Sequence, residues 1–130
     1  MYNYEALNEY QTNHIQGKVA ASSPHGLVAM LLQGILDKLA KAKGAIARND
    51  IALRGQEISA TIRIIDNLRA SLDLKNGGNI ANSLHALYDY MERRLVQANA
   101  SADPRILNEV ARLIEEIKVG WDTIAKEAGK

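Results

Sequence analysis

The chain has 130 residues, enough for one domain, and its 16 basic and 15 acidic residues leave a formal net charge of +1, which excludes the broad basic face of a nucleic-acid binder. It has no cysteine, which excludes disulfides and thiolate metal sites. No run approaches the roughly 20 apolar residues of a membrane span, and the first residues lack a secretory signal, so we expect a cytosolic protein without membrane insertion.

The opening segment, about residues 4–15, is predicted to be a short helix that ends before Gly17. Its larger apolar side chains recur at near-helical spacing at Tyr4, Leu7 and Tyr10, and Ile15 lies beyond them. Two interpretations stay open, because such a stripe either completes the core permanently or covers it until a partner helix takes its place. We expect residues 1–17 to form a mobile N-terminal capping segment.

A long helix is predicted over residues 24–48, because Ser23 suits the N-cap position and Pro24 suits the first turn. Its apolar side chains cover more than one face: Leu27, Val28, Met30, Leu31, Leu32, Ile35, Leu36 and Leu39. A helix with so wide an apolar arc must bury more than one side. The second side needs a partner, which is either the opening segment or another molecule.

Three further helices are predicted over residues 51–72, 79–99 and 104–128. The first follows Asn49 or Asp50 as a cap, the second follows the Gly77-Gly78 turn, and the third begins at Asp103-Pro104. Short connections make successive helices antiparallel neighbours. The sequence therefore predicts an all-α single domain, an antiparallel up-down four-helix bundle over residues 24–128 with a short N-terminal capping helix.

Apolar stripes with steps of three and four support this arrangement. In the third predicted long helix the stripe is Ile80, Leu84, Leu87, Met91 and Leu95. In the last helix it is Val110, Ile114, Ile117, Trp121 and Ile124. We expect both stripes to face the bundle core.

Little in the sequence points to catalysis, a metal or a cofactor. None of the three histidines follows a Glu at the spacing of a di-iron centre, and no phosphate-binding or nucleophile motif occurs. His85 raises one alternative, a histidine phosphotransfer bundle, although the Lys-Gly pair typical of that family is replaced by Leu87-Tyr88. A solvent-facing position explains His85 more simply, and we interpret His25 as a first-turn residue. We expect no enzyme.

Several blocks of the sequence resemble the flagellin-specific export chaperones, the FliS-type family. Tyr10-Gln11 matches its early Tyr-Gln pair, and Ser23-Pro24 followed by residues 25–31 resembles its Ser-Pro-x-x-Leu-Ile-x-Met-Leu signature. Residues 71–81, with Gly77-Gly78, resemble the loop that enters its fourth helix. Leu87-Tyr88-Asp89-Tyr90-Met91 with Arg94-Leu95 resembles another block, and Trp121 with Ile124 resembles its last helix. Leu32 departs from the family, in which many members have Tyr.

This resemblance implies a monomeric four-helix bundle, without catalysis or cofactor, whose N-terminal helix covers an apolar groove. It implies binding of the disordered C-terminal region of flagellin, prevention of its premature polymerisation in the cytosol and delivery to the flagellar export gate. A domain-swapped dimer through the opening segment stays open as an alternative to the monomer.

The client-binding residues expected from the resemblance and from the opening stripe fall into two groups. The covering segment contributes Leu7, Tyr10, Gln11 and Ile15. The long helices contribute Leu27, Leu31, Tyr88, Tyr90, Met91 and Leu95. We expect a client helix to replace the opening segment against these side chains.

Overall fold

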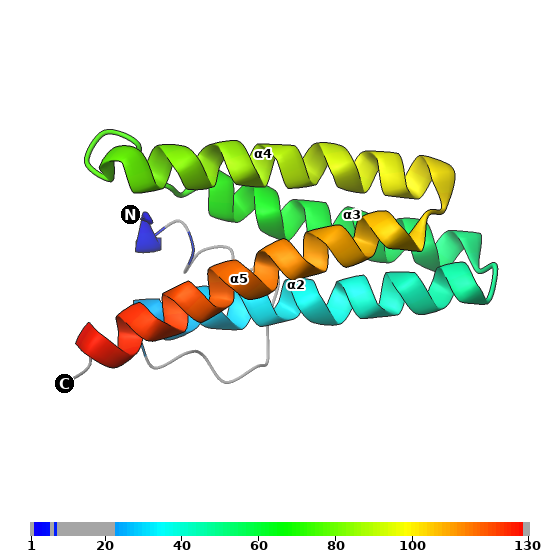
Figure 1. The fold of residues 1–130 in the computed structure, drawn as a ribbon, viewed down its shortest axis with the longest axis horizontal. Helices are drawn as coiled ribbons and strands as arrows, with labels where there is room; N and C mark the ends of the chain where they lie inside the picture. Colours follow the sequence, from blue (N-terminus) through cyan, green and yellow to red (C-terminus); the bar gives the residue numbers. More distant parts are fainter. Residues whose placement is uncertain (1, 6, 8–22, 129–130) are drawn as a thin grey trace.

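The structure, a computed structural model, describes residues 2–5, 7 and 23–128, with the backbone alone for residues 124–128. It contains four long helices: α2 (Pro24–Ala47), α3 (Ile51–Ala70), α4 (Gly78–Ser101) and α5 (Pro104–Ala128). Each helix end lies within two residues of its predicted position, and the all-α bundle is confirmed (Figure 1).

Local capping explains why the helices begin where they do. The Ser23 side chain accepts a hydrogen bond from Gly26 N at 3.1 Å, and Pro24 occupies the first turn of α2. Of the two predicted caps for α3, Asp50 is used, since its carboxylate accepts from Leu53 N at 3.0 Å. The Asp103 carboxylate accepts from Arg105 N at 2.9 Å where α5 begins.

The turn before α4 requires both of its glycines, for different reasons. Gly78 has φ +62°, a left-handed conformation that side chains disfavour. A Cβ on Gly77 would lie 2.5 Å from the backbone oxygen of Asp73 and 2.5 Å from the Cβ of Ala81. Any other residue at position 77 would therefore push the turn away from the start of α4.

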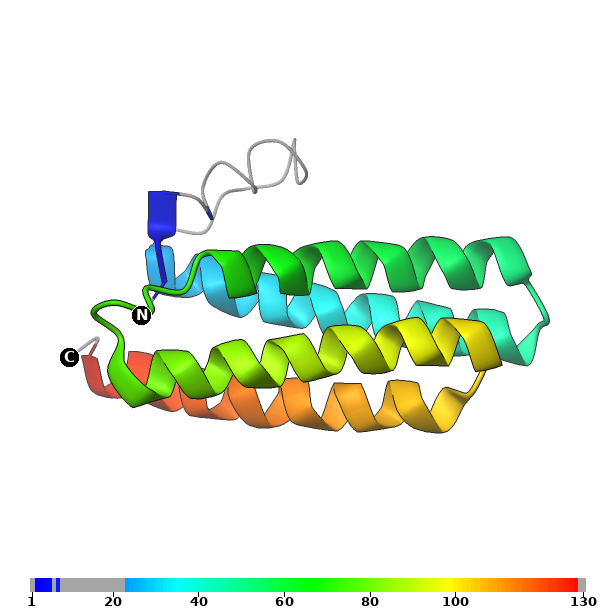
Figure 2. The ribbon, with the colours of Figure 1, turned by 90° about the horizontal axis from the view of Figure 1, so that it is seen from above.

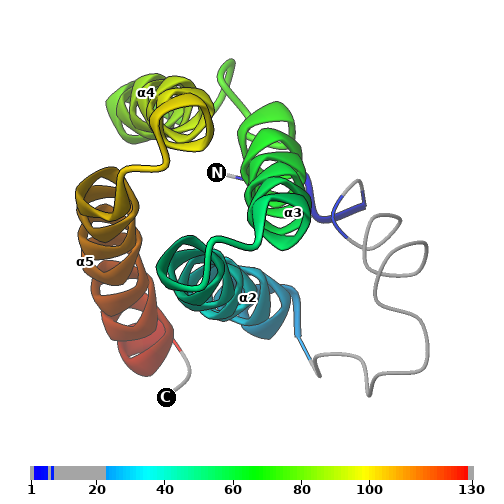
Figure 3. The ribbon, with the colours of Figure 1, turned by 90° about the vertical axis from the view of Figure 1, so that its right-hand side faces the viewer.

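The four helices pack as a ring of neighbours, in which α2 contacts α3 and α5, and α4 contacts the same two helices (Figure 3). Figure 2 shows the helices running side by side for most of their length. Their inward faces form one hydrophobic cluster, which also contains Tyr2 and Leu7 from the opening segment. Within the described helices, none combines the length and hydropathy that a membrane crossing needs.

The wide apolar arc of α2 is covered mainly by its two neighbours. Its large apolar side chains are mostly buried, and Met30, Leu36 and Ile46 remain partly accessible. Because Tyr2 and Leu7 join the same cluster, the first of the two expected partners, the opening segment, is present. In this conformation α2 offers no long open groove along its buried face.

The last part of α5 leaves α4 and approaches the start of α2, as Figures 1 and 3 show from two directions. The start of α4 consequently lacks a neighbour on that side, and Ile80 is 62% exposed. The prediction that Ile80 faces the core is therefore wrong. Leu84 and Leu87, one and two turns later, are partly buried against the core.

We predict that Ala102→Gly stabilises the protein. Ala102 ends α4 with φ 51°, a left-handed conformation that costs an L-residue about 1–2 kcal/mol, whereas glycine adopts it freely. Glycine also gains entropy in the unfolded chain, so the net gain should be about 0.5–1 kcal/mol in urea denaturation.

The matched control for this substitution is Ala86→Gly, at an exposed position inside α4. That change should destabilise the protein by about 1 kcal/mol. Equal losses of stability in both variants would show that the end of α4 is not left-handed in solution.

Candidate functional site

Tyr2, the first described residue, is inserted into the end of the bundle where α5 leaves α4. Its side chain is only 5% exposed, and its hydroxyl lies 2.5 Å from the hydroxyl of Tyr88, which is fully buried on α4. The Tyr2 ring stands at 83° to the indole of Trp121, with ring centroids 5.4 Å apart. This edge-to-face geometry is one that aromatic pairs favour.

Burial controls the protonation of both phenols. It raises the pKa of Tyr2 to about 12, and it raises the pKa of Tyr88 well above its usual value. Both hydroxyls are therefore neutral at physiological pH, so one donates and the other accepts in the hydrogen bond between them.

Trp121 is held in place by a reciprocal contact with His25, which we call the His25–Trp121 clasp. The indole Nε1 donates to the backbone oxygen of His25 at 2.9 Å, and His25 Nε2 donates to the backbone oxygen of Trp121 at 2.8 Å. The two rings are stacked with centroids 4.0 Å apart and planes 11° from parallel. A carbonyl can only accept, so Nε2 carries a proton in this contact. The clasp joins the start of α2 to the last turns of α5.

The described residues 2–5 and 7 contact the bundle through both backbone and side chains. Asn3 N donates to the backbone oxygen of Ser71, and Tyr2 pairs with Leu72 in an isolated antiparallel bridge. Leu7 N donates to the backbone oxygen of Asn3 at 3.3 Å, and the Leu7 side chain is buried. Burial of the Tyr2 and Leu7 side chains thus contributes to the attachment of these described residues.

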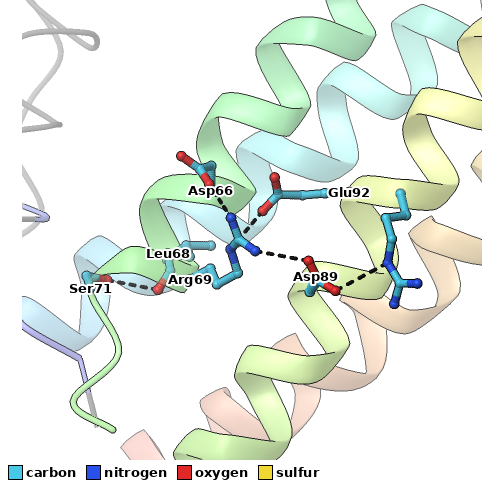
Figure 4. A network of polar contacts seen from close by, with 7 residues as sticks. Asp66, Leu68, Arg69, Ser71, Asp89 and Glu92 are labelled. Carbon is cyan, nitrogen blue, oxygen red and sulfur yellow. Dashed lines mark hydrogen bonds and ion pairs between the residues drawn. The ribbon is translucent and has the colours of Figure 1, made fainter.

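The walls around Tyr2 are stabilised by polar contacts on the outside of the bundle. Figure 4 shows Arg69, near the end of α3, reaching toward Asp89 and Glu92 on α4. The guanidinium lies 3.0 Å from the Asp89 carboxylate, 3.2 Å from that of Glu92 and 2.8 Å from that of Asp66. Burial raises the pKa of Glu92, while the positive charge of Arg69 opposes that shift.

A second polar cluster joins α4 to α5 near the other end of the bundle. Glu109 on α5 accepts from Arg94 Nε at 2.8 Å and from the Tyr90 hydroxyl at 2.7 Å. These bonds hold the pKa of Glu109 below its usual value, with the bond from Arg94 as the largest cause. The two helices are therefore fastened here, whereas they diverge at the end occupied by Tyr2.

Among the described residues, one apolar surface is accessible on α4 near this site, and another lies farther along the bundle. Ile80, Leu84 and Leu87, which we call the α4 strip, line a shallow hollow of about 330 Å³ with Asn79 and Ser83. A second hollow of about 260 Å³ lies between α2 and α5, lined by Leu36, Leu39, Ala40, Lys43, Leu107, Asn108, Ala111 and Glu115. No trio of histidine, aspartate or glutamate side chains among the described residues is placed to bind a metal ion. The arrangement suits binding of an apolar segment.

Comparison with known proteins identifies the family. Residues 6–128 match the family described as flagellar protein FliS. The chain belongs to the FliS family. It is 44% identical to the flagellar secretion chaperone FliSB of Pseudomonas aeruginosa, over 96% of this chain and 99% of that protein. It is 38% identical to the flagellar secretion chaperone FliS of Salmonella typhimurium, over 98% and 96% of the two chains.

The fold comparison agrees with this assignment. A crystal structure of a flagellar chaperone from bacteria superimposes with a TM-score of 0.76, covering 92% of this chain and 98% of that one at 12% identity. At so low an identity this likeness supports the fold alone. As a member of the FliS family, the chain is a flagellar export chaperone.

The FliS-family residues expected to bind a client do not form one open surface. Five of them are buried in the core: Leu27, Leu31, Tyr88, Met91 and Leu95. Tyr90 is partly buried, and its hydroxyl donates to Glu109. Leu7, from the covering segment, is buried in the core cluster. Tyr10, Gln11 and Ile15 lie outside the described residues. Of the buried group, Tyr88 lies in direct contact with Tyr2 through their hydroxyls.

Sequence reasoning missed two parts of this FliS-family site. Tyr2 precedes the predicted opening helix, so it belongs to none of the periodic patterns in the sequence. His25 was interpreted only as a first-turn residue, yet its ring forms half of the clasp with Trp121. His85, the candidate for phosphotransfer, is half-buried on α4.

We predict that acidification destabilises the protein partly through Glu109. A carboxyl group whose pKa is lowered in the folded state contributes stability above its ordinary value of 4.5, and this contribution is lost as the pH falls through the folded value. The melting temperature should therefore fall between pH 5 and about pH 3 by less in Glu109→Gln than in the wild type. At neutral pH the variant should be the less stable of the two.

The matched control is Glu116→Gln, which changes an exposed carboxylate on the same helix. Differential scanning fluorimetry should give this variant the pH dependence of the wild type. Identical pH profiles for Glu109→Gln and the wild type would show that the cluster with Arg94 does not form in solution.

Proposed function

We propose that this chain binds the disordered C-terminal region of flagellin in the cytosol, prevents its premature polymerisation and assists its delivery to the flagellar export gate. The client folds as a helix against the apolar end of the bundle and takes the place of residues 2–7. Membership of a family of flagellar secretion chaperones supports the class of client. We propose a monomer that binds one client, with a domain-swapped dimer as the alternative.

The observation that carries this proposal is that Tyr2 and Leu7, which belong to a short segment outside the four long helices, have their side chains buried in the bundle. The walls around Tyr2 come from α4, from α5 and from Leu72, which lies two residues after the end of α3. The clasp holds α5 against the start of α2, and Arg69 joins α3 to α4. A short segment outside the four long helices is easier to displace than one of those helices, because fewer contacts are lost. Withdrawal of residues 2–7 would leave an apolar site whose walls persist.

The α4 strip offers a client helix a place to start. Its members lie at positions i, i+4 and i+7, the spacing by which one helix face presents anchors to another helix. Leu84 and Leu87 also pack against the cluster that contains Tyr2 and Tyr88. A client helix along the strip would therefore continue directly into the site that residues 2–7 now cover.

Energetics favour reversible binding. Burying ~1,000 Å² of apolar surface contributes roughly 25 kcal/mol before costs, at ~25 cal/mol per Å². Ordering about 20 client residues costs about 1–2 kcal/mol each for the backbone. The two terms are of similar size, so each well-placed anchor has a large influence on the affinity. An export chaperone benefits from this balance, because its client must later leave.

Our first prediction for binding concerns the α4 strip. Ile80→Asp places a charge where the client helix should lie, so affinity for a flagellin C-terminal peptide should fall by at least about tenfold in isothermal titration calorimetry. Ile80 is 62% exposed, so the bundle should keep its helical circular dichroism signal.

Val96→Asp is the matched control. Val96 is also on α4 and also 62% exposed, and at 16 residues from Ile80 it faces nearly the opposite way. This variant should lose less than about threefold in affinity. Equal losses in the two variants, or none in Ile80→Asp, would refute the strip as part of the client site.

A second prediction concerns the cover. Deletion of residues 2–7 should raise affinity for the flagellin peptide by about two- to tenfold, because it removes a competitor for the same site. Glu5→Ala changes an exposed residue of the same segment and should leave affinity unchanged. Loss of binding by a deletion variant that is still folded would mean that residues 2–7 contact the client rather than compete with it.

A further inference from the structure

The space that Tyr2 fills, which we call the Tyr2 slot, is bounded by Tyr88, Trp121 and Leu72. Two of these walls are fixed without any help from Tyr2. Trp121 is held by two hydrogen bonds and ring stacking in the clasp with His25, and Tyr88 lies in the middle of α4. The slot should therefore keep its shape when Tyr2 leaves it.

The walls of the slot restrict which chemical groups can fill it favourably. Trp121 accommodates a flat ring set at a right angle to its own plane, as Tyr2 does at 83°. At the inner end, the fully buried Tyr88 hydroxyl is bonded to the Tyr2 hydroxyl at 2.5 Å. An apolar occupant would leave that hydroxyl without this bond in a site closed to water, which is unfavourable. A phenol satisfies both requirements.

We propose that the Tyr2 slot is a binding site selective for a phenol ring, and that a tyrosine of the client enters it when residues 2–7 withdraw. The second part rests on the proposed function, whereas the first concerns this chain alone. Tyr2 is the exchangeable member of the tyrosine pair, because it lies on the weakly attached segment and Tyr88 lies within a long helix.

The selectivity is tested with the full-length Tyr2→Gly variant, which empties the slot. The probe is p-cresol, which reproduces the tyrosine side chain with Cβ as its methyl group. Toluene is the matched probe without the hydroxyl. Trp121 is the single tryptophan of the chain, so the NMR signal of its indole N–H reports on the slot directly. We expect saturable shifts of this signal, with p-cresol binding at least about tenfold more tightly than toluene.

Replacing Tyr88 as well identifies the source of the selectivity. In Tyr2→Gly with Tyr88→Phe, the preference for p-cresol over toluene should fall to less than about threefold, because the buried hydroxyl partner is gone. Equal binding of the two probes to Tyr2→Gly, or no saturable shift, would overturn the proposal.

If Tyr2→Gly does not fold, a cycle of Tyr2→Phe and Tyr88→Phe tests the same hydroxyl pair. Each single variant should lower the melting temperature, and the double variant should lie close to the singles because the pair is lost only once. Strictly additive losses would overturn the hydroxyl pairing on which the proposal depends.

The client part is tested by competition. p-Cresol should weaken binding of a tyrosine-containing flagellin C-terminal peptide to Tyr2→Gly, and the same peptide with Tyr→Phe should bind more weakly than its parent. Binding of the peptide unaffected by saturating p-cresol would overturn the client part. If p-cresol binds but the peptide binds neither Tyr2→Gly nor the wild type, the proposed function fails and the phenol selectivity stands.

Discussion

The clasp between His25 and Trp121 determines the geometry of the functional end of the bundle. Its two hydrogen bonds and stacked rings draw the last turns of α5 toward the start of α2. One helix cannot cover both of its neighbours at that point, so α5 leaves the start of α4 exposed (Figure 3). Tyr2 occupies the inside of the resulting opening, and Ile80 remains exposed on its outer side.

Polar and apolar contacts have separate roles around this opening. Arg69 joins α3 to α4 from outside, and Glu109 joins α4 to α5 near the other end. Neither cluster depends on residues 2–7. The opening segment contributes apolar side chains and one buried hydroxyl, so its removal changes the core locally while the long helices keep their mutual contacts. On the proposed exchange, this separation would let residues 2–7 withdraw without unfolding of the bundle.

Much of the fold could be predicted because it depends on local chemistry. Ser23, Asp50 and Gly78 act at helix ends, where a cap or a positive φ is decided within a few residues. Local sequence also determines which side chains share one face of a helix. Whether a neighbouring helix covers that face depends on the packing of the whole bundle. Ile80 belongs to the same stripe as Met91, yet one is exposed and the other is buried because α5 tilts away between them.

The candidate site was less predictable for the same reason. The sequence predicts Tyr88 and Met91 as client-binding residues, and both side chains are buried in the core. The sequence cannot separate a groove from a core, since both use apolar residues at helical spacing. The contact between Tyr2 and Tyr88 spans 86 positions of the chain. A pairing at such separation leaves no periodic signal, and only the three-dimensional arrangement reveals it.

On the proposed exchange, the covalent attachment of residues 2–7 also explains how a client can be released. Residues 2–7 remain attached after the client displaces them, so they stay at a high effective concentration near the site that they left. The client therefore competes against a segment that can return as soon as one of its own anchors detaches. Release then requires no unfolding of the bundle, because Tyr2 restores the bond to Tyr88 as the client leaves.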